Sequence, residues 1–279
     1  LSLPLWAIFV VEKNDVKRFT FDYSYWSHDG FKVTESGVFV PASPDSRYAS
    51  QQTVFDDLGR GILQNAFDGY NCSLFAYGQT GSGKSYSVVG YGVNRGIIPI
   101  ACAELFQRIN ENKDPSKAFQ VTISIMEIYS EKVHDLLSAK PKEQAALPVR
   151  QCASGGFFVQ DLKKVPVGSY TEIEQRMAQG IANRTIAATN MNASSSRAHT
   201  LMCITFDQII TKSVGGQLNS SRLSSVINFV DLAGSERADS TGATGDRLKE
   251  GANINRSLSA LGNVISQNCN DSGDLTGRY

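Results

Sequence analysis

Eight consecutive residues have the spacing of a loop that binds polyphosphate. The string Gly78-Gln-Thr-Gly-Ser-Gly-Lys-Ser85 fits the pattern GxxxxGK[ST]. Its glycines allow the backbone to curl so that successive N–H groups face phosphate at a helix N-terminus, where the helix dipole adds positive potential. Lys84 can reach the β- and γ-phosphates, and the Ser85 hydroxyl can ligate Mg²⁺. Nucleotide contacts are therefore predicted from Gly78, Gln79, Thr80, Gly81, Ser82, Gly83, Lys84 and Ser85.

A glycine-rich turn without function is the alternative explanation of this loop. Average residue frequencies would produce the pattern by accident in roughly one chain of this length in a hundred. Here an apolar run, Asn71–Tyr77, precedes the loop and a helix-compatible stretch follows it. This strand–loop–helix setting is the one that phosphate binding requires, and it argues against an accident.

A second motif lies further along the chain, at Val226-Ile-Asn-Phe-Val-Asp-Leu-Ala-Gly-Ser-Glu-Arg237. An apolar strand that ends in Asp, followed by Gly three residues later, is typical of the second half of a phosphate-loop NTPase. Asp231 would hold Mg²⁺ indirectly, from the second coordination shell or through water, and the N–H of Gly234 would sense the γ-phosphate. Alone, D-x-x-G occurs in many plain turns. Together with the upstream loop it indicates nucleotide hydrolysis rather than a structural interaction module.

Phosphoryl transfer needs neutralised charge and a positioned water more than it needs a covalent nucleophile. Lys84, Mg²⁺ and Arg197 can neutralise charge, while serine hydroxyls and Glu236 can order water. The nearest string to a guanine-reading N-K-x-D loop, Asn112-Lys-Asp-Pro115, lacks the final Asp, so nothing supports guanine specificity.

Strand-like and helix-like patterns alternate along the chain, which predicts a central sheet flanked by helices. Pro99 is placed at a helix start, and Thr171 with Glu174 forms a capping box. Helix patterns cover Val54–Ala66, Pro99–Ile109, Thr171–Ala182 and Ile254–Ile265, and strand patterns cover Asn71–Tyr77, Val121–Ile125, Ala198–Ile210 and Leu223–Val230. The predicted fold class is α/β, with a mixed central β-sheet of the P-loop NTPase type and helices on both faces.

The composition of the chain limits the classes of protein to which it can belong. A chain of 279 residues can bury a large core, and the absence of repeats or Pro/Ser-rich linkers favours one domain. Lys+Arg (27) equals Asp+Glu (27), so no overall field predicts nucleic acid or an anionic membrane as partner. No apolar stretch reaches the roughly 18 residues of a membrane span, which predicts no direct membrane contact.

The five cysteines are scattered without a CxxC pair, at Cys72, Cys102, Cys152, Cys203 and Cys269. This favours a reduced, intracellular protein with buried thiols. The apolar start, residues 1–11, lacks a basic n-region and an initiator Met, so it is predicted to be a core strand rather than a signal peptide. Cytoplasm is the expected location.

Further strings resemble the kinesin motor domain. Asn192-Ala-Ser-Ser-Ser-Arg-Ala-His199 is similar to the kinesin loop NxxSSRSH, and Asp231-Leu-Ala-Gly-Ser-Glu-Arg237 is identical to DLAGSER. Both follow the phosphate loop in the family's order. Phe21-Asp-Tyr-Ser-Tyr-Trp-Ser27 most resembles the subfamily that transports vesicles and organelles. The likeness runs from about Phe19 to about Ile265, and it implies an ATPase that is stimulated by microtubules and moves along them.

The resemblance implies roles for individual residues. Ser196 would bind Mg²⁺ or the γ-phosphate, beside Ser195, and Asn192 would lie near the attacking water. Arg197 and Glu236 would form an ion pair that latches the two nucleotide-sensing loops. Tyr48 and Tyr86 would lie against the adenosine, although tyrosines often fill a core instead. The expected catalytic set is Asn192, Ser195, Ser196, Arg197, Gly234 and Glu236; the expected metal ligands are Ser85, Ser196 and Asp231.

Two neighbours of these residues receive different interpretations. His199 is predicted to satisfy hydrogen bonds rather than to do chemistry. Ala198 replaces the serine usual in the family, which removes one hydroxyl and is expected to tune the rate.

Microtubule binding would involve the helix Lys249–Ile265 and the loop before it. Microtubule surfaces are acidic, so exposed basic side chains are the expected contacts. The predicted contacts are Arg150, Arg237, Arg247, Lys249 and Arg256. The alternative is a solvated helix of mixed charge, because Asp239, Asp246 and Glu250 offset these cations. Gln151-Cys152 also departs from the family's Glu-His.

Two features of the family are missing. No RxRP-like adenine clamp precedes Trp6, and no lysine-rich loop, further helices or neck linker follow Ile265. Residues 1–279 are therefore predicted to be a single kinesin motor domain that is incomplete at both ends, with cargo or adaptor contacts in other regions. A non-motile, microtubule-bound scaffold is the alternative; the presence of Arg197, Gly234 and Glu236 argues against it.

Overall fold

The computed structural model describes residues 6–12, 15–139, 145–153, 155–191, 195–214, 217–236 and 246–271 of the chain. Its centre is a six-stranded sheet in the order β12-β8-β13-β14-β5, with β9 paired to β8. β14 and β5 are parallel and the other pairs antiparallel, so the sheet is mixed, as predicted. The strands are β5 (Cys72–Ala76), β8 (Lys117–Tyr129), β9 (Lys132–Asp135), β12 (Val165–Val167), β13 (His199–Val214) and β14 (Gln217–Asp231).

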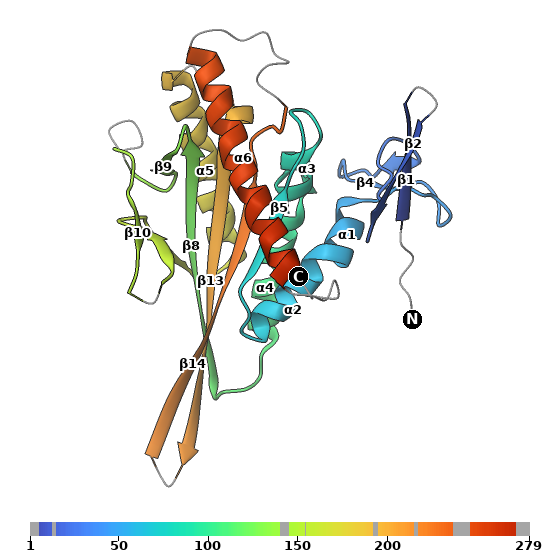
Figure 1. Ribbon diagram of the computed structural model, residues 1–279. Helices are drawn as coiled ribbons and strands as arrows, with labels where there is room; N and C mark the ends of the chain where they lie inside the picture. Colours follow the sequence, from blue (N-terminus) through green and yellow to red (C-terminus); the bar gives the residue numbers. More distant parts are fainter. Residues whose placement is uncertain are drawn as a thin grey trace.

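Helices cover both faces of the sheet (Figure 1). Helices α2 to α5 share the core on one face, and α6 crosses the other face. Their bounds are α2 (Arg60–Phe67), α3 (Lys84–Val88), α4 (Ile97–Glu111), α5 (Tyr170–Met191) and α6 (Asp246–Asp271). Helix α1 (Gln51–Val54) and a π-helical turn (Phe55–Gly59) lead directly into α2. The predicted helix over Val54–Ala66 is therefore present, with a wider turn in its middle.

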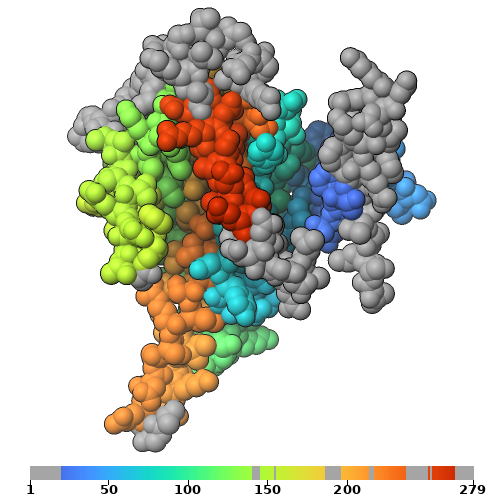
Figure 2. All heavy atoms as spheres, viewed as in Figure 1, coloured from blue at the N-terminus to red at the C-terminus, as the bar shows by residue number. Residues whose placement is uncertain are grey.

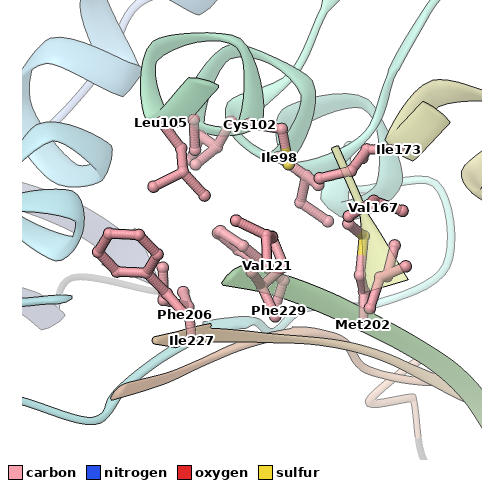
Figure 3. Packing of buried hydrophobic residues seen from close by; sticks show 14 of the residues in the cluster. Ile98, Cys102, Leu105, Val121, Val167, Ile173, Met202, Phe206, Ile227 and Phe229 are labelled. Carbon is pink, nitrogen blue, oxygen red and sulfur yellow. The ribbon is translucent and has the colours of Figure 1, made fainter. Parts of the chain in front are cut away.

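The core lies between the sheet and α4 (Figure 3). Ile98, Cys102 and Leu105 recur at helical spacing, so they share one face of α4, which Figure 3 shows packed over the sheet. Phe206 and Phe229 project from β13 and β14 into the same cluster, and Leu105 and Phe206 are fully buried. Full burial of one such side chain stabilises the fold by about 1.5–3 kcal/mol.

The cysteines only partly match their prediction. Cys102 is fully buried, and burial raises the pKa of its thiol to about 12, so this thiol is chemically inert. Cys72 and Cys203 are half-buried. Cys152 is exposed, so the prediction of a buried thiol is wrong there, because a short hairpin carries this residue away from the core.

The first strand does not join the central sheet. β1 (Trp6–Glu12) pairs along its whole length with β2 (Asp15–Phe21) in a separate two-stranded sheet. The prediction of a strand at the start is confirmed, but the prediction that it belongs to the core sheet is wrong. Only two residues separate the two strands in sequence, which makes the local hairpin pairing the easiest one to form.

The start of α5 also differs from the predicted capping box. The hydroxyl of Ser169, not Thr171, accepts the backbone N–H of Glu172, and the Glu172 carboxylate accepts the N–H of Gly168. Ser-x-x-Glu is shifted two residues upstream of the predicted pair because Tyr170 already has helical geometry. Helix α4 likewise starts two residues before Pro99.

Short hairpins surround the main layers. They are formed by β3 (Phe31–Val33) with β4 (Phe39–Pro41), β6 (Gly90–Tyr91) with β7 (Asn94–Arg95), and β10 (Val149–Gln151) with β11 (Phe157–Val159). Among the described residues, no helix combines the length and the apolar character that crossing a membrane requires.

Strands β13 and β14 run beyond their neighbours and project as a two-stranded ribbon (Figures 1 and 2). Asp207 lies at the root of this ribbon with a side chain only 2% exposed, and it accepts a hydrogen bond from Arg222, whose side chain is 61% exposed. The hydrogen bond from Arg222 holds the pKa of Asp207 below its ordinary value. Arg222, whose side chain is largely exposed, therefore balances the negative charge of the buried Asp207 carboxylate.

Replacing Arg222 by alanine should lower the free energy of unfolding by about 2 kcal/mol at pH 7, because a buried carboxylate loses its charged partner. The folded-state pKa of Asp207 is depressed, so this stabilisation is present above the ordinary carboxyl pKa of about 3.9 and is lost as the pH falls below it. Denaturant unfolding at several pH values checks both points. Lys117→Ala, which removes an exposed pair with Asp114, should cost less than about 1 kcal/mol. Equal losses in the two variants would contradict the assignment.

Candidate phosphate-binding site and its surroundings

The predicted phosphate loop connects β5 to α3, as a phosphate site requires. Gly78 has φ +154°, and a Cβ there would collide with the Ser82 hydroxyl, so the loop can close only with glycine at this position. The ammonium group of Lys84 donates to the carbonyl oxygens of Gly78 and Gln79, both at 3.0 Å. Lys84 therefore lies over the centre of the loop, where it can exchange these carbonyls for phosphate oxygens.

Parallel pairing of β14 with β5 brings the second motif to this loop. The register places Asp231 opposite Ala76, and the N–H of Leu232 donates to the Ala76 carbonyl at 3.2 Å. The Ser85 hydroxyl then donates to Asp231 Oδ2 at 2.5 Å. The first turn of α3 thus supplies the hydroxyl, and the carboxyl end of β14 the carboxylate, that were predicted to hold Mg²⁺.

The chain beyond Asp231 returns across the phosphate loop. The N–H of Ser235 donates to the Gly78 carbonyl at 3.1 Å. Both carboxylate oxygens of Glu236 accept hydrogen bonds from Thr80, one from its N–H at 2.9 Å and one from its hydroxyl at 2.5 Å. A Cβ at Gly234 would collide with the Glu236 carboxylate and the Thr80 hydroxyl, so a larger residue here would require both side chains to move.

Glu236 is held as a carboxylate in this position. Partial burial opposes its ionisation, but the hydrogen bonds from Thr80 and the attraction of Lys84 outweigh burial, and the pKa of Glu236 lies below its ordinary value. The carboxylate is therefore charged at neutral pH. The ion pair between Glu236 and Arg197 stays a prediction; the contacts of Glu236 described here are with Thr80.

The loop that carries the predicted serines meets the same crossing. Ser195–Arg197 forms a 3₁₀ turn directly before β13. The N–H of Gly234 donates to the carbonyl oxygen of Ser196 at 2.8 Å. The two loops predicted to sense phosphate are thus joined by their backbones. Asn192 lies outside the described residues.

These three segments enclose a cavity of about 320 Å³. Lys84, Ser85, Ser196 and Asp231, which were predicted to contact nucleotide or metal, line it together with Thr80, Gly81, Gly83, Tyr86, Tyr91, Arg184 and Leu232. Sequence analysis missed Tyr91 and Arg184. Tyr91 lies on β6, close to the ring of Tyr86 (5.9 Å between centroids), and no motif marks it.

Tyr48 does not line this cavity. Its side chain is buried behind Tyr86 and packs on Phe31, with 5.3 Å between ring centroids. Burial, with the neighbouring Tyr86, raises the pKa of its hydroxyl. Tyr86 therefore lines the cavity, whereas Tyr48 lies outside its lining and contacts Tyr86; the predicted adenosine contacts of both residues stay a prediction.

Arg184 reaches the cavity from α5 and pairs with Glu127 of β8 at 3.3 Å. Burial raises the pKa of Glu127, although the attraction of Arg184 opposes this shift. The pair ties the helix that precedes the predicted serine loop to the central sheet.

The oxygen atoms of the site fit a magnesium ion bound with phosphate. Asp231 Oδ1 is buried and, among the described residues, has no hydrogen-bond partner, while Oδ2 is held by Ser85. No group of three or more His, Cys, Asp or Glu side chains that could bind a metal by itself occurs in the described part of the chain. A hard ion that shares its ligands with phosphate and water suits this donor set of one carboxylate and two hydroxyls.

Comparison with known proteins identifies the chain. Residues 10–275 match the kinesin motor domain. The chain belongs to the kinesin family. Kinesin-like protein KIF28 of Rattus norvegicus is 53% identical over 251 residues, which are 90% of this chain and 24% of that protein. Kinesin-related protein 1 of Dictyostelium discoideum is 53% identical over 257 residues, 91% of this chain and 11% of that protein. Human kinesin-like protein KIF1C is 49% identical over 256 residues, 91% of this chain and 22% of that protein.

Solved kinesin structures share this fold. A KIF14 dimer with AMP-PNP on a microtubule has a TM-score of 0.82 and 38% identity, with 99% of this chain and 74% of that chain covered. KIF14 with ADP on a microtubule has a TM-score of 0.81 and 38% identity, with 100% and 75% covered. The kinesin fold predicted from the motifs is thereby confirmed. The chain spans about a quarter or less of the length of the curated kinesins named above.

Four of the five basic residues predicted to contact a microtubule fall in the described part of this kinesin, one on β10 and three on α6. Arg150 is exposed on β10, where its guanidinium donates to Gln160. Arg256 is exposed on α6, which lies on the face of the molecule shown in Figure 2. Arg247 and Lys249 fall in the first turn of α6, and Arg237 lies outside the described residues.

Proposed function

We propose that this chain is a motor domain that hydrolyses ATP and couples hydrolysis to binding and movement along microtubules. One observation carries most of the proposal: three segments far apart in sequence meet at one cavity. The phosphate loop, the Ser195–Arg197 turn and the loop that follows Asp231 are joined there by hydrogen bonds from Gly234 to Ser196 and from Thr80 to Glu236.

In this function the phosphate loop binds the polyphosphate through its backbone N–H groups and Lys84. Ser85, Ser196 and Asp231 would hold Mg²⁺, which supplies charge neutralisation at the β- and γ-phosphates. Ser195 and Asn192 would position the attacking water, and Glu236, charged at neutral pH, would order it. Arg197 would neutralise charge that develops on the transferred group.

Helix α6 would couple ATP hydrolysis to microtubule binding. It crosses the sheet face opposite the core and carries Arg256, Lys249 and Arg247, whose positive charge suits an acidic microtubule surface. Arg150 would add a second contact. The KIF14 relatives are described on microtubules with AMP-PNP and with ADP, which supports tubulin as the partner and ATP or ADP as the nucleotide of this chain. A microtubule-associated location in the cell follows from the same proposal.

The rate of phosphate release by the full-length protein, with and without microtubules, tests this function. We expect turnover of ATP to rise at least about tenfold when microtubules are added, a gain of about 1.4 kcal/mol in transition-state stabilisation. A nucleotide-binding scaffold would bind both ligands without that rise. No turnover in either condition, with nucleotide bound, would exclude the motor.

A further inference from the structure

His199 connects the nucleotide loops to α6. It is the first residue of β13, two positions after Arg197, and its side chain points to the face of the sheet that α6 crosses. Only 7% of its surface is exposed. Its two ring nitrogens bind two different elements: Nδ1 contacts the N–H of Ala233 at 3.1 Å, and Nε2 contacts the hydroxyl of Ser257 at 2.8 Å.

These contacts determine the tautomer of the imidazole. A backbone N–H can only donate, so Nδ1 of His199 must accept from Ala233 and carry no proton. Nε2 then carries the proton and donates to the Ser257 hydroxyl. Burial lowers the pKa of His199, against the weaker opposing influence of Glu131 and Asp231, which agrees with a neutral ring.

The hydrogen bonds continue into the backbone of α6. The Ser257 hydroxyl, which accepts from His199, donates to the carbonyl oxygen of Ile254 at 2.8 Å. The hydrogen bonds therefore form a chain in which each group donates to the next: Ala233 to His199, His199 to Ser257, and Ser257 to the backbone of α6. Ala233 directly precedes Gly234, the residue whose N–H binds Ser196. A shift of the Gly234 segment would therefore move His199 and change its hydrogen bond to Ser257.

A second hydrogen bond on the same side of α6 offers a comparison. The Asn253 side chain, one helical turn before Ser257, donates to the hydroxyl of Ser130 at 3.2 Å. Ser130 lies in the turn between β8 and β9, away from the residues that line the nucleotide cavity. Both bonds attach α6 to the sheet, but only the bond of Ser257 leads to a nucleotide loop.

We infer that His199, as the neutral Nε2–H tautomer, is a positioning residue that transmits the position of the Ala233–Gly234 segment to α6 through Ser257. This inference adds a coupling residue to the proposed function. Its expected effect on microtubule-stimulated turnover rests on that proposed function. The ring is suited to the task because it is rigid, buried and bonded at both nitrogens, so it cannot follow one partner without moving the other.

Ser257→Ala tests the inference in the full-length protein, with Ser257→Thr and Asn253→Ala as controls. We expect ATP affinity and basal turnover within about twofold of wild type in all three variants. Microtubule-stimulated kcat should fall at least about fivefold in Ser257→Ala, recover in Ser257→Thr, and stay within about twofold of wild type in Asn253→Ala. Equal losses in Ser257→Ala and Asn253→Ala would overturn the inference, because the bond would then only attach the helix.

His199→Asn supplies a second, independent arm. The asparagine oxygen can replace Nδ1 as acceptor for Ala233 but cannot reach Ser257, so this variant should resemble Ser257→Ala. The double variant should then be no worse than either single one. Multiplied losses would overturn the inference, because the two residues would act separately.

Amide hydrogen exchange of the isolated protein separates this inference from the proposed function. Ser257→Ala should reduce protection in the 232–235 segment, because His199 loses its fixed position, whereas Asn253→Ala should not. Unchanged protection of that segment in Ser257→Ala would overturn the inference even if the wild type is a motor. A wild type without microtubule stimulation would refute the proposed function, and the exchange result would still decide the role of His199.

Discussion

Replacing Lys84 by alanine should weaken the binding of both ATP and ADP at least about a hundredfold, which corresponds to about 2.7 kcal/mol. The ammonium group lies over the phosphate loop, 3.0 Å from the carbonyls of Gly78 and Gln79, and it is the cation of the loop itself. Its loss leaves the phosphates with backbone N–H donors and Mg²⁺ alone. Titration calorimetry with Mg-ADP measures the effect.

Lys117→Ala is the matched control for that measurement. Lys117 begins β8 and pairs with Asp114 near the surface, away from the residues that line the nucleotide cavity. Its removal should leave nucleotide affinity within about twofold of wild type. Unchanged affinity in Lys84→Ala would contradict the assignment of residues 78–85 as the phosphate site.

Replacing Glu236 by alanine should leave nucleotide affinity within about threefold of wild type and lower microtubule-stimulated turnover at least about a hundredfold. Glu236 contacts Thr80 rather than the phosphate position, so binding survives. Turnover fails because the water loses a charged group and the two loops lose their predicted latch to Arg197. Steady-state rates with saturating microtubules test this, and stimulated rates near wild type would refute the latch.

Thr80→Val separates two ways in which Glu236 could act. The variant removes the hydroxyl that Glu236 binds but keeps the carboxylate, and it is expected to retain turnover within about fivefold of wild type. A loss as large as that of Glu236→Ala would show that Glu236 works by holding the phosphate loop, not by pairing with Arg197.

Local sequence patterns predicted the arrangement of the phosphate loop and Asp231, because this arrangement depends on short stretches of the chain. The spacing of Gly78, Lys84 and Ser85 is typical of a strand–loop–helix unit. Asp231 ends an apolar strand, and such a strand is expected in the interior of the sheet, where it pairs with β5. The meeting of Ser85 and Asp231 follows from these two facts, since parallel strands end at the same edge.

The misses depend on contacts that no local pattern records. The pairing of Glu236 with Thr80 requires knowing that the chain after Asp231 turns back across the phosphate loop. Arg184 belongs to an ordinary amphipathic helix, and only the packing of α5 on β8 brings it to the cavity. The strand at Trp6–Glu12 was predicted correctly as a strand, but it pairs with the strand that follows it in sequence, Asp15–Phe21.

In the proposed function, one two-state element links the loops around the cavity to α6, so nucleotide and microtubule must bias each other's binding. The direct test is the dissociation constant of the full-length protein for microtubules, measured with AMP-PNP and again with ADP. We predict binding at least about tenfold tighter with AMP-PNP, a coupling free energy of about 1.4 kcal/mol. Equal dissociation constants with the two nucleotides would contradict the claim.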